Sequence, residues 1–156
     1  METWDAIRAR RNVRTFEPRA IPPDALDRIL EAARRTSSSN NQQAWDFVVC
    51  TDRDQLRELA KVWRYAEHVS GSAATVALIP PESDDASERE TFQYDLGQVT
   101  MSIMITAADL GIGSCHSAVD DQDLAHRILG LPPDRRCEWL ISLGHRPTDR
   151  SSRSGD

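Results

Sequence analysis

The chain has few cysteines and no long apolar run. Its 156 residues include only three cysteines, Cys50, Cys115 and Cys137, which lack the Cys-x-x-Cys or His spacing of a zinc site. We therefore expect reduced, structural thiols and no metal ion. No stretch approaches the roughly 20 apolar residues of a membrane span, and no signal-peptide pattern begins the sequence. These absences predict a cytoplasmic protein that does not contact a membrane.

The chain also lacks an excess of positive charge. Its formal net charge of −6 argues against a nucleic-acid partner, because proteins that bind nucleic acid usually carry a basic face. The charges are unevenly placed: residues 1–19 contain five arginines and three acids, whereas residues 82–95 contain six acids and one arginine. An anionic ligand is therefore expected near the N-terminal segment.

The segment Arg10-Arg11-Asn12-Val13-Arg14 concentrates three guanidinium groups and one amide. If it is extended, alternate side chains share a face, so Arg10, Asn12 and Arg14 project to one side while Val13 points into a core. Guanidinium groups pair bidentately with phosphate oxygens, and an amide can bind a ring carbonyl. The segment predicts a phosphate site; the alternative is a set of solvated arginines that favour the dipole of the preceding helix.

A polar loop follows the second predicted helix. Residues 36–43 are eight small polar or amide residues, and Ala44 and Trp45 then lead into the apolar run 47–50. Hydroxyl and carboxamide groups can bind the edge of a flat heteroaromatic ring, and a loop before a buried strand is a suitable place for them. The alternative is an ordinary turn, because Ser and Asn favour loops by bonding their own backbone.

Helix and strand signals alternate along the chain. We expect helices from Thr3, over 23–33, from Asp52 through Trp63, over 88–110 and over 120–129, and strands over 47–51, 73–79 and 137–143. Apolar residues cover a broad face of the longest helix, so it should be buried on most sides, in part by a second subunit. Residues 1–147 are expected to form a single domain and residues 148–156 a disordered tail.

The two polar segments, in this order, resemble motifs of the nitroreductase family of flavin mononucleotide (FMN) enzymes. The family has an Arg-Arg-Ser-Val-Arg-x-Phe-like motif, a helix ending in Ala-Ala-Arg and a Pro-Ser-x-x-Asn-x-Gln-Pro-Trp loop, which correspond to residues 10–16, 32–34 and 37–45. Asn12, Ser37 and Ala44 depart from these motifs. Residues 111–114 and 143–147 are similar to two weaker family motifs. The resemblance implies an α+β fold with a small mixed sheet flanked by helices.

The resemblance also implies a homodimer, because in that family the flavin lies at a dimer interface. Arg10, Arg11, Asn12 and Arg14 of one subunit would hold the phosphate, ribityl chain and ring edge. The other residues implied by the family motifs are Ser37, Ser38, Ser39 and Asn41 of the second subunit, with Gln43 nearby, the backbone of Gly111 and Gly113, and Arg146 or Arg150 at the phosphate.

FMN would carry the implied reaction. NAD(P)H would deliver hydride to the flavin and leave, and an electron-poor acceptor such as a nitroaromatic or quinone would follow in ping-pong order. No side chain needs to act as a catalytic acid or base, and His116 is expected to make only a local polar contact. The short chain between residues 63 and 92 favours an alternative, a flavin- or nucleotide-binding module without efficient turnover. A third reading is a protein without a cofactor, in which the long helix only dimerises.

Overall fold

A computed structural model of the chain describes residues 1–148, at the centre of which lies a four-stranded sheet. The strands are β1 (Asp46–Cys50), β2 (Ala74–Ile79), β3 (Gly113–Ala118) and β4 (Trp139–Gly144), in the order β1-β2-β4-β3. All three strand pairs are antiparallel. Within residues 1–148 the parallel pairing expected of a mixed sheet is confined to an isolated bridge between Asn12 and Ser114.

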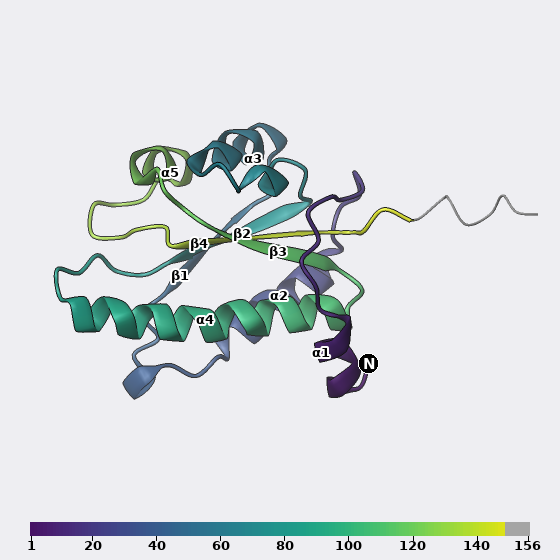
Figure 1. Cartoon of the computed structure of the whole chain (residues 1–156), viewed down its shortest axis with the longest axis horizontal. Coiled ribbons are helices and arrows are strands. Elements are labelled where there is room, and N and C mark those ends of the chain that lie inside the picture. The colour runs from purple at the N-terminus through teal and green to yellow at the C-terminus, as the bar shows by residue number, and fades with distance from the viewer. Residues whose placement is uncertain (149–156) are drawn as a thin grey trace, which may run out of the picture.

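Helices cover both faces of the sheet, so the molecule has three layers (Figure 1). One face carries α1 (Thr3–Ala9), α2 (Pro23–Arg34) and α4 (Ala86–Asp109), and the other carries α3 (Arg53–Leu59) and α5 (Gln122–Leu129). Three short 3₁₀ helices, η1 (Ser39–Asn41), η2 (Ala60–Val62) and η3 (Glu67–Val69), lie in the connections. The predicted α+β fold, with a small sheet flanked by helices, is confirmed.

The alternation of side chains along β2 and β4 builds two cores. Leu78 and Ile141 face α2 and α4, where Ile103 is fully buried, while Ala77 and Leu140 face α3 and α5. Because neighbouring residues of a strand point to opposite faces, a continuously apolar strand can serve both layers. The six residues of β2 are all buried, which explains why this strand was predictable from sequence.

Helix boundaries follow their capping residues. The Asp52 side chain accepts a hydrogen bond from Gln55 N at 2.8 Å, and Gly130 ends α5 with a φ of 65°. The Asp85 carboxylate caps α4, so this helix begins at Ala86, two residues before the predicted start. The first helix begins at Thr3 as predicted, and Glu2, which precedes it, makes no side-chain cap. The third helix ends at Leu59 and continues only as η2 toward Trp63.

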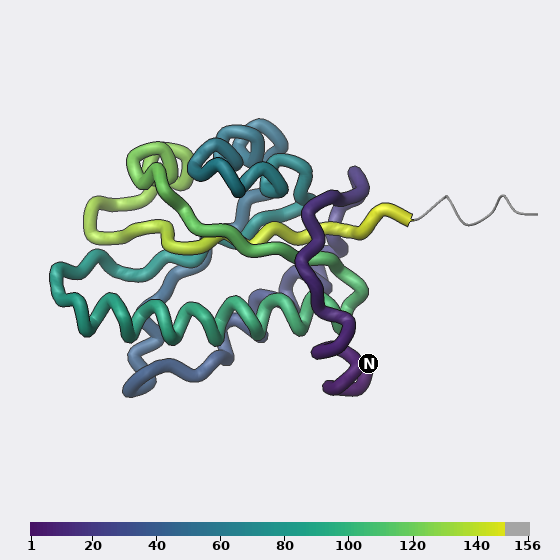
Figure 2. Tube along the Cα trace, in the orientation of Figure 1, coloured from purple at the N-terminus to yellow at the C-terminus, as the bar shows by residue number. Residues whose placement is uncertain are grey.

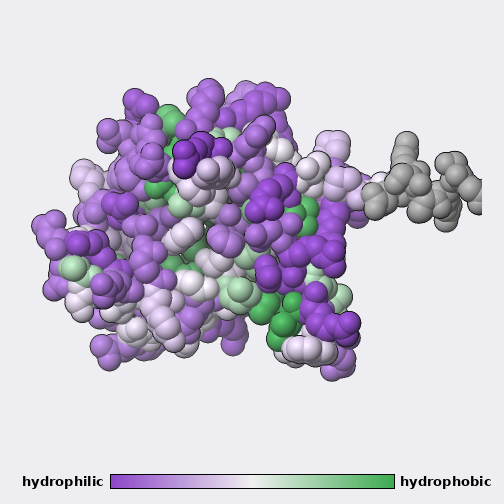
Figure 3. All heavy atoms as spheres, in the orientation of Figure 1, coloured by the Kyte–Doolittle hydropathy of each residue, from purple (hydrophilic) through white to green (hydrophobic). Residues whose placement is uncertain are grey.

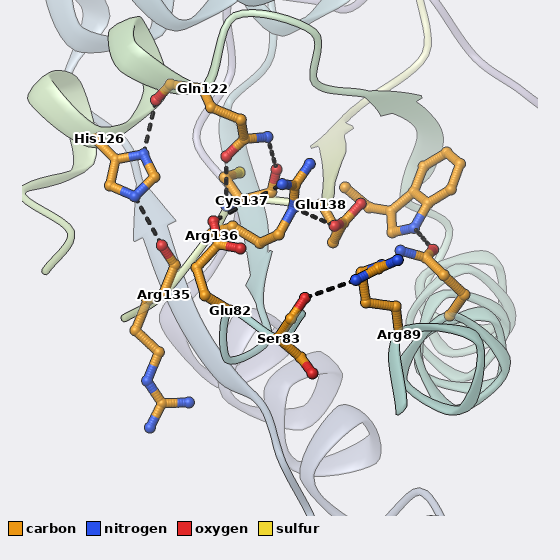
Figure 4. A network of polar contacts seen from close by, with 11 residues as sticks. Glu82, Ser83, Arg89, Gln122, His126, Arg135, Arg136, Cys137 and Glu138 are labelled. Carbon is orange, nitrogen blue, oxygen red and sulfur yellow. Dashed lines mark hydrogen bonds and ion pairs between the residues drawn. The ribbon is translucent and has the colours of Figure 1, made fainter. Parts of the chain in front are cut away.

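A polar network joins α5 to the segment before β4, at the end of the sheet away from the N-terminus (Figure 4). The Gln122 side chain accepts from Cys137 N at 3.1 Å and donates to the Cys137 carbonyl at 2.6 Å. The His126 ring contacts the carbonyl oxygens of Gln122 and Arg135, each at 2.7 Å. These bonds satisfy buried polar groups and fix the position of β4 against α5.

The three cysteines are free and buried, as predicted. Burial raises the pKa of Cys50 to about 11 and that of Cys137 to about 12, and it also raises the pKa of Cys115. Protonated thiols are poor nucleophiles, so these groups act as small apolar side chains. Within residues 1–148, no helix has both the length and the hydropathy needed to cross a membrane.

The expected tail begins at residue 148. Thr148 is hydrogen-bonded to the Glu17 carboxylate, from its backbone N at 2.9 Å and from its hydroxyl at 3.2 Å. The other residues assigned to the tail, 149–156, lie outside the described part of the chain, and so does Arg150.

Candidate functional site

Residues 10–14, called the arginine segment from here on, lie against the outer edge of β3. Val13 N donates to the Ser114 carbonyl oxygen at 2.8 Å, and the Val13 side chain is buried. The backbone of Arg10 is extended, and Arg11 and Arg14 are exposed. Period-two alternation thus places the apolar residue inside and leaves the polar side chains outside, as the sequence predicts.

Val13 occupies space that only a glycine at position 113 leaves open. A Cβ on Gly113 would lie 2.9 Å from both Val13 Cβ and Val13 Cγ1. Valine is branched at Cβ and has few alternative rotamers, so it cannot move away easily. Glycine is therefore needed at position 113 because the Val13 side chain packs directly against its Cα. Gly113 itself is buried.

Replacing Gly113 by alanine is expected to lower the free energy of unfolding by about 1–3 kcal/mol, because the added methyl overpacks this contact. Urea denaturation measures the change. Gly71→Ala is the matched control, since nothing lies within 4 Å of a Cβ at that exposed position. The control should leave stability unchanged or raise it by about 0.4–1 kcal/mol. Equal stability of Gly113→Ala and the parent chain would contradict the packing argument.

A cavity of about 890 Å³ opens beside the arginine segment. Its walls come from four parts of the chain: Asn12 and residues 14–16, residues within 63–71, residues 116–118 of β3, and Trp139 of β4. This volume lies within the range of about 300–1,000 Å³ that is typical of small-molecule and cofactor sites. The cavity is therefore large enough for a nucleotide-sized ligand.

The outer edge of β3 contributes backbone groups to this cavity. The Ser114 carbonyl points outward, because it accepts the bond from Val13 N. Backbone groups two and four residues further along a strand point the same way, so those of His116 and Ala118 also face outward. Both residues line the cavity. Beyond the bridge at Ser114, no strand of the described chain pairs with this edge, so these groups are available to a ligand.

Two arginines impose a positive field on the cavity. Burial lowers the pKa of His116, and the charges of Arg10 and Arg14 lower it further. Burial also lowers the pKa of His68 to about 4, with Arg14 again contributing. Within residues 1–148, no ion pair joins Arg10, Arg11 or Arg14 to a carboxylate. Three guanidinium groups are thus available for an anion.

Two polar contacts hold the His68 ring at the cavity wall. His68 Nδ1 lies 2.6 Å from the Ser142 hydroxyl, and that hydroxyl lies 3.1 Å from the Cys115 carbonyl. The Nε2 atom of His68 and the Ser117 hydroxyl are buried without a partner in the described chain. Such buried orphan groups indicate a place where a further polar partner can bind.

The polar loop of residues 36–43, called the amide loop from here on, lies beneath α4 in the view of Figure 1. It contributes no residue to the cavity. Among its residues, Ser38 and Ser39 are partly buried, whereas Ser37, Asn41 and Gln43 are exposed. Asn40, Asn41 and Gln43 have φ values of 52°, 53° and 50°, a conformation that L-residues rarely adopt. The Ser38 hydroxyl accepts from Gln43 N at 2.8 Å, and Gln43 Nε2 donates to Asn41 Oδ1 at 2.7 Å.

The amide loop and the arginine segment lie near different ends of α4 (Figure 2). Asp95 contacts Ser39 of the loop, whereas Asp109 pairs with the amino group of Met1, 3.2 Å away, at the start of α1. Fourteen residues separate the two aspartates, a rise of about 21 Å along the helix. The residues implied by the family motifs therefore form two groups that do not meet within one chain.

Two further predicted residues lie close to the arginine segment. Arg146 donates to the Ala9 carbonyl at 3.3 Å, directly before Arg10. Gly111, with a φ of 73°, caps the end of α4 and lines the same hollow as Ala9 and Arg146. Glycine tolerates this left-handed conformation at the end of a helix without strain.

Several cavity residues were missed by sequence reasoning. The aromatic pair Trp63 and Tyr65, with ring centroids 4.7 Å apart, forms part of the wall, and Arg64 lies over the Tyr65 ring. His116 does more than make the expected local contact, because it lines the cavity beside Trp139. The dense aromatic and basic run at residues 63–65 was the available signal in the sequence.

Comparison with known proteins agrees with this geometry. The family model described as "Nitroreductase family" matches residues 7–74, which contain both the arginine segment and the amide loop. A protein of Archaeoglobus fulgidus, named as a candidate NADH dehydrogenase/NAD(P)H nitroreductase, is 24% identical over 99% of this chain and 91% of its own length.

Solved structures have the same fold. A nitroreductase family protein from Clostridium novyi is 26% identical, with a TM-score of 0.86 over 96% of this chain and 87% of the other. The NADPH:FMN oxidoreductase of Vibrio harveyi, solved with NAD⁺, superposes with a TM-score of 0.85 at 21% identity, over 94% of this chain and 69% of the other. The chain therefore matches the nitroreductase family model over residues 7–74, and its fold is that of solved nitroreductase family proteins.

Proposed function

We propose that this chain is an FMN-dependent oxidoreductase that passes hydride from NAD(P)H to an electron-poor acceptor. Similar proteins are named as NAD(P)H nitroreductases, which supports the oxidoreductase part of the proposal. The flavin-specific part rests on one observation. Arg14 lines a cavity of about 890 Å³, Arg10 acts on His116 in its wall, and neither arginine has a carboxylate partner in residues 1–148. That combination fits a phosphate joined to a large planar ring.

The residues present fit FMN in polarity as well as in size. Arg10, Arg14 and the nearby Arg146 would hold the phosphate, with Arg11 and Asn12 at the ribityl chain and ring edge. The outward backbone groups of His116 and Ala118, with the orphan Ser117 hydroxyl, would meet the polar edge of the ring. FMN, when bound, would supply the hydride chemistry. The chain would orient the ring and exclude water; no side chain is assigned as a proton donor.

The shared site requires a homodimer, because the amide loop cannot reach the arginine segment of its own chain. Large apolar side chains remain exposed on α1 and α4: Trp4, Ile7, Tyr94 and Met101. Figure 3 shows hydrophobic atoms gathered over α1 and the adjacent end of α4. Exposed apolar surface of this kind supports a protein–protein contact. A second copy on this face would bring its own Ser37, Ser39 and Asn41 to the flavin. We also infer that residues 1–147 act as one domain.

The test is a visible absorption spectrum of the purified chain after incubation with FMN and desalting, repeated after anaerobic NADPH and then NADH. We expect a retained flavin spectrum that bleaches with a nicotinamide donor. Retention without bleaching would instead support a flavin-binding module without turnover. If no flavin is retained, the proposal is wrong.

A further inference from the structure

Asp95 is a buried carboxylate whose role the proposed function does not yet use. It lies on α4 with 4% of its surface exposed, and no ion pair within residues 1–148 includes it. Burying a charge without a cation is costly unless hydrogen bonds compensate for the lost water. The partners of this carboxylate therefore indicate what it is for.

Within residues 1–148, the hydrogen-bond donors to this carboxylate all belong to Ser39. Ser39 N donates to both carboxylate oxygens, at 3.2 and 3.1 Å, and the Ser39 hydroxyl donates to Oδ1 at 3.1 Å. Hydrogen bonds to a charged acceptor are stronger than those between neutral groups. The buried Asp95 carboxylate therefore binds one residue of the amide loop, Ser39.

Two more contacts continue the same line along α4. The Ser37 hydroxyl donates to Gln98 Oε1 at 3.3 Å, and the Thr36 hydroxyl donates to Ser102 Oγ at 2.9 Å. The helix residues are spaced by three and four, so they share one face. The loop consequently runs antiparallel to α4 and is attached to it at three places, with Asp95 the only charged one.

The attachment opposes strain in the loop. Three residues just after Ser39 have φ between 50° and 53°, and such conformations persist only where surrounding contacts determine them. The Ser39–Asp95 bonds hold the start of this strained stretch, and the Ser38–Gln43 bond holds its end. On the other side of the loop, Asn41 and Gln43 are exposed. Attachment to α4 therefore sets where these amides lie.

We propose that Asp95 is a positioning residue that holds the amide loop in the conformation that binds FMN across the dimer interface. This inference rests on the proposed function. It assigns Asp95 no contact with the flavin: the carboxylate acts through Ser39. Its loss should release the loop and weaken FMN binding while the dimer and the sheet remain intact.

The test compares Asp95→Asn with Glu90→Gln, which removes the same charge from an exposed position on the same helix. Two quantities are measured: the FMN dissociation constant and amide hydrogen exchange of residues 37–43. For Asp95→Asn we expect the dissociation constant to rise at least tenfold and exchange in the loop to accelerate at least tenfold, with the dimer retained. Glu90→Gln should change neither quantity by more than twofold.

A double variant separates positioning from general stability. If Asp95 acts through Ser39, then Ser39→Ala combined with Asp95→Asn should weaken FMN binding scarcely more than Asp95→Asn alone. Additive effects of the two substitutions would overturn the inference. If Asp95→Asn does not fold, Ser39→Ala tests the hydroxyl bond alone, because alanine keeps the backbone N–H that donates to Asp95. A smaller acceleration of exchange in residues 37–43 is then expected, and unchanged exchange would overturn the inference.

The outcomes also separate this inference from the proposed function. Faster loop exchange with unchanged FMN affinity would leave the proposed function standing and overturn the role of Asp95. If the parent chain binds no FMN, both fail, and the exchange data then assign Asp95 a purely structural role.

Discussion

Met101→Glu is expected to convert the proposed FMN-binding dimer into a folded monomer that does not retain FMN. Met101 is 43% exposed on α4, so a glutamate there costs an isolated subunit little. In a dimer, the same carboxylate would be desolvated among apolar side chains, which is strongly unfavourable. We expect the dimer dissociation constant to rise at least 100-fold, about 2.8 kcal/mol. Sedimentation velocity and the flavin spectrum after desalting measure both losses.

Two controls make this result specific. Met101→Leu keeps the surface apolar and should preserve both the dimer and the flavin. Ile103→Glu, two residues along, is a different experiment, because Ile103 is fully buried in the core between α4 and the sheet. That variant should not fold, so it cannot report on the dimer. A Met101→Glu protein that remains a dimer with bound FMN would exclude this face of α4 from the interface.

Arg14→Ala is expected to raise the FMN dissociation constant by one to two orders of magnitude. Arg14 lines the cavity, and its charge affects both His68 and His116. Losing a charge-assisted bond to a phosphate costs about 1.5–3 kcal/mol. Arg10→Ala should have an effect of the same size. Fluorescence titration of FMN measures the change, and the loss should be larger at low salt, where charges are less screened.

Arg127→Ala is the matched control for these titrations. It removes one exposed positive charge from α5, on the opposite face of the sheet from α1 and α4. Its FMN affinity should equal that of the parent chain within about twofold. If Arg10→Ala and Arg14→Ala bind FMN as tightly as this control, the arginine segment does not hold the phosphate.

Local signals predicted much of the fold correctly. Asp52 and Gly130 mark helix ends because capping depends on residues within one turn of the boundary. The apolar runs of β2 and β4 predict buried strands in the same way. The missed strand, β3, has the sequence Gly-Ser-Cys-His-Ser-Ala, which contains little apolar side-chain surface. Its pairing with β4 comes from the partner strand and from the Val13 contact, both distant in sequence.

The candidate site likewise has a part that was predictable from local sequence and a part that was not. Arg10, Asn12 and Arg14 were predictable as a group because an extended backbone puts alternate residues on one side. The cavity was not predictable, since Trp63, His68 and His116 meet only after β3 pairs with β4. Asp95 was equally hidden, because its bonds to Ser39 cross 56 positions of the chain.

The sequence by itself determined the helices and most strands, the polar character of two segments and the family motifs, because each depends on residues close together in the chain. Tertiary structure decided which segments meet: it placed Val13 over Gly113, opened the cavity along the free edge of β3, and separated the amide loop from the arginines by much of the length of α4. Contacts between distant segments depend on how whole elements pack, and no local pattern encodes that packing.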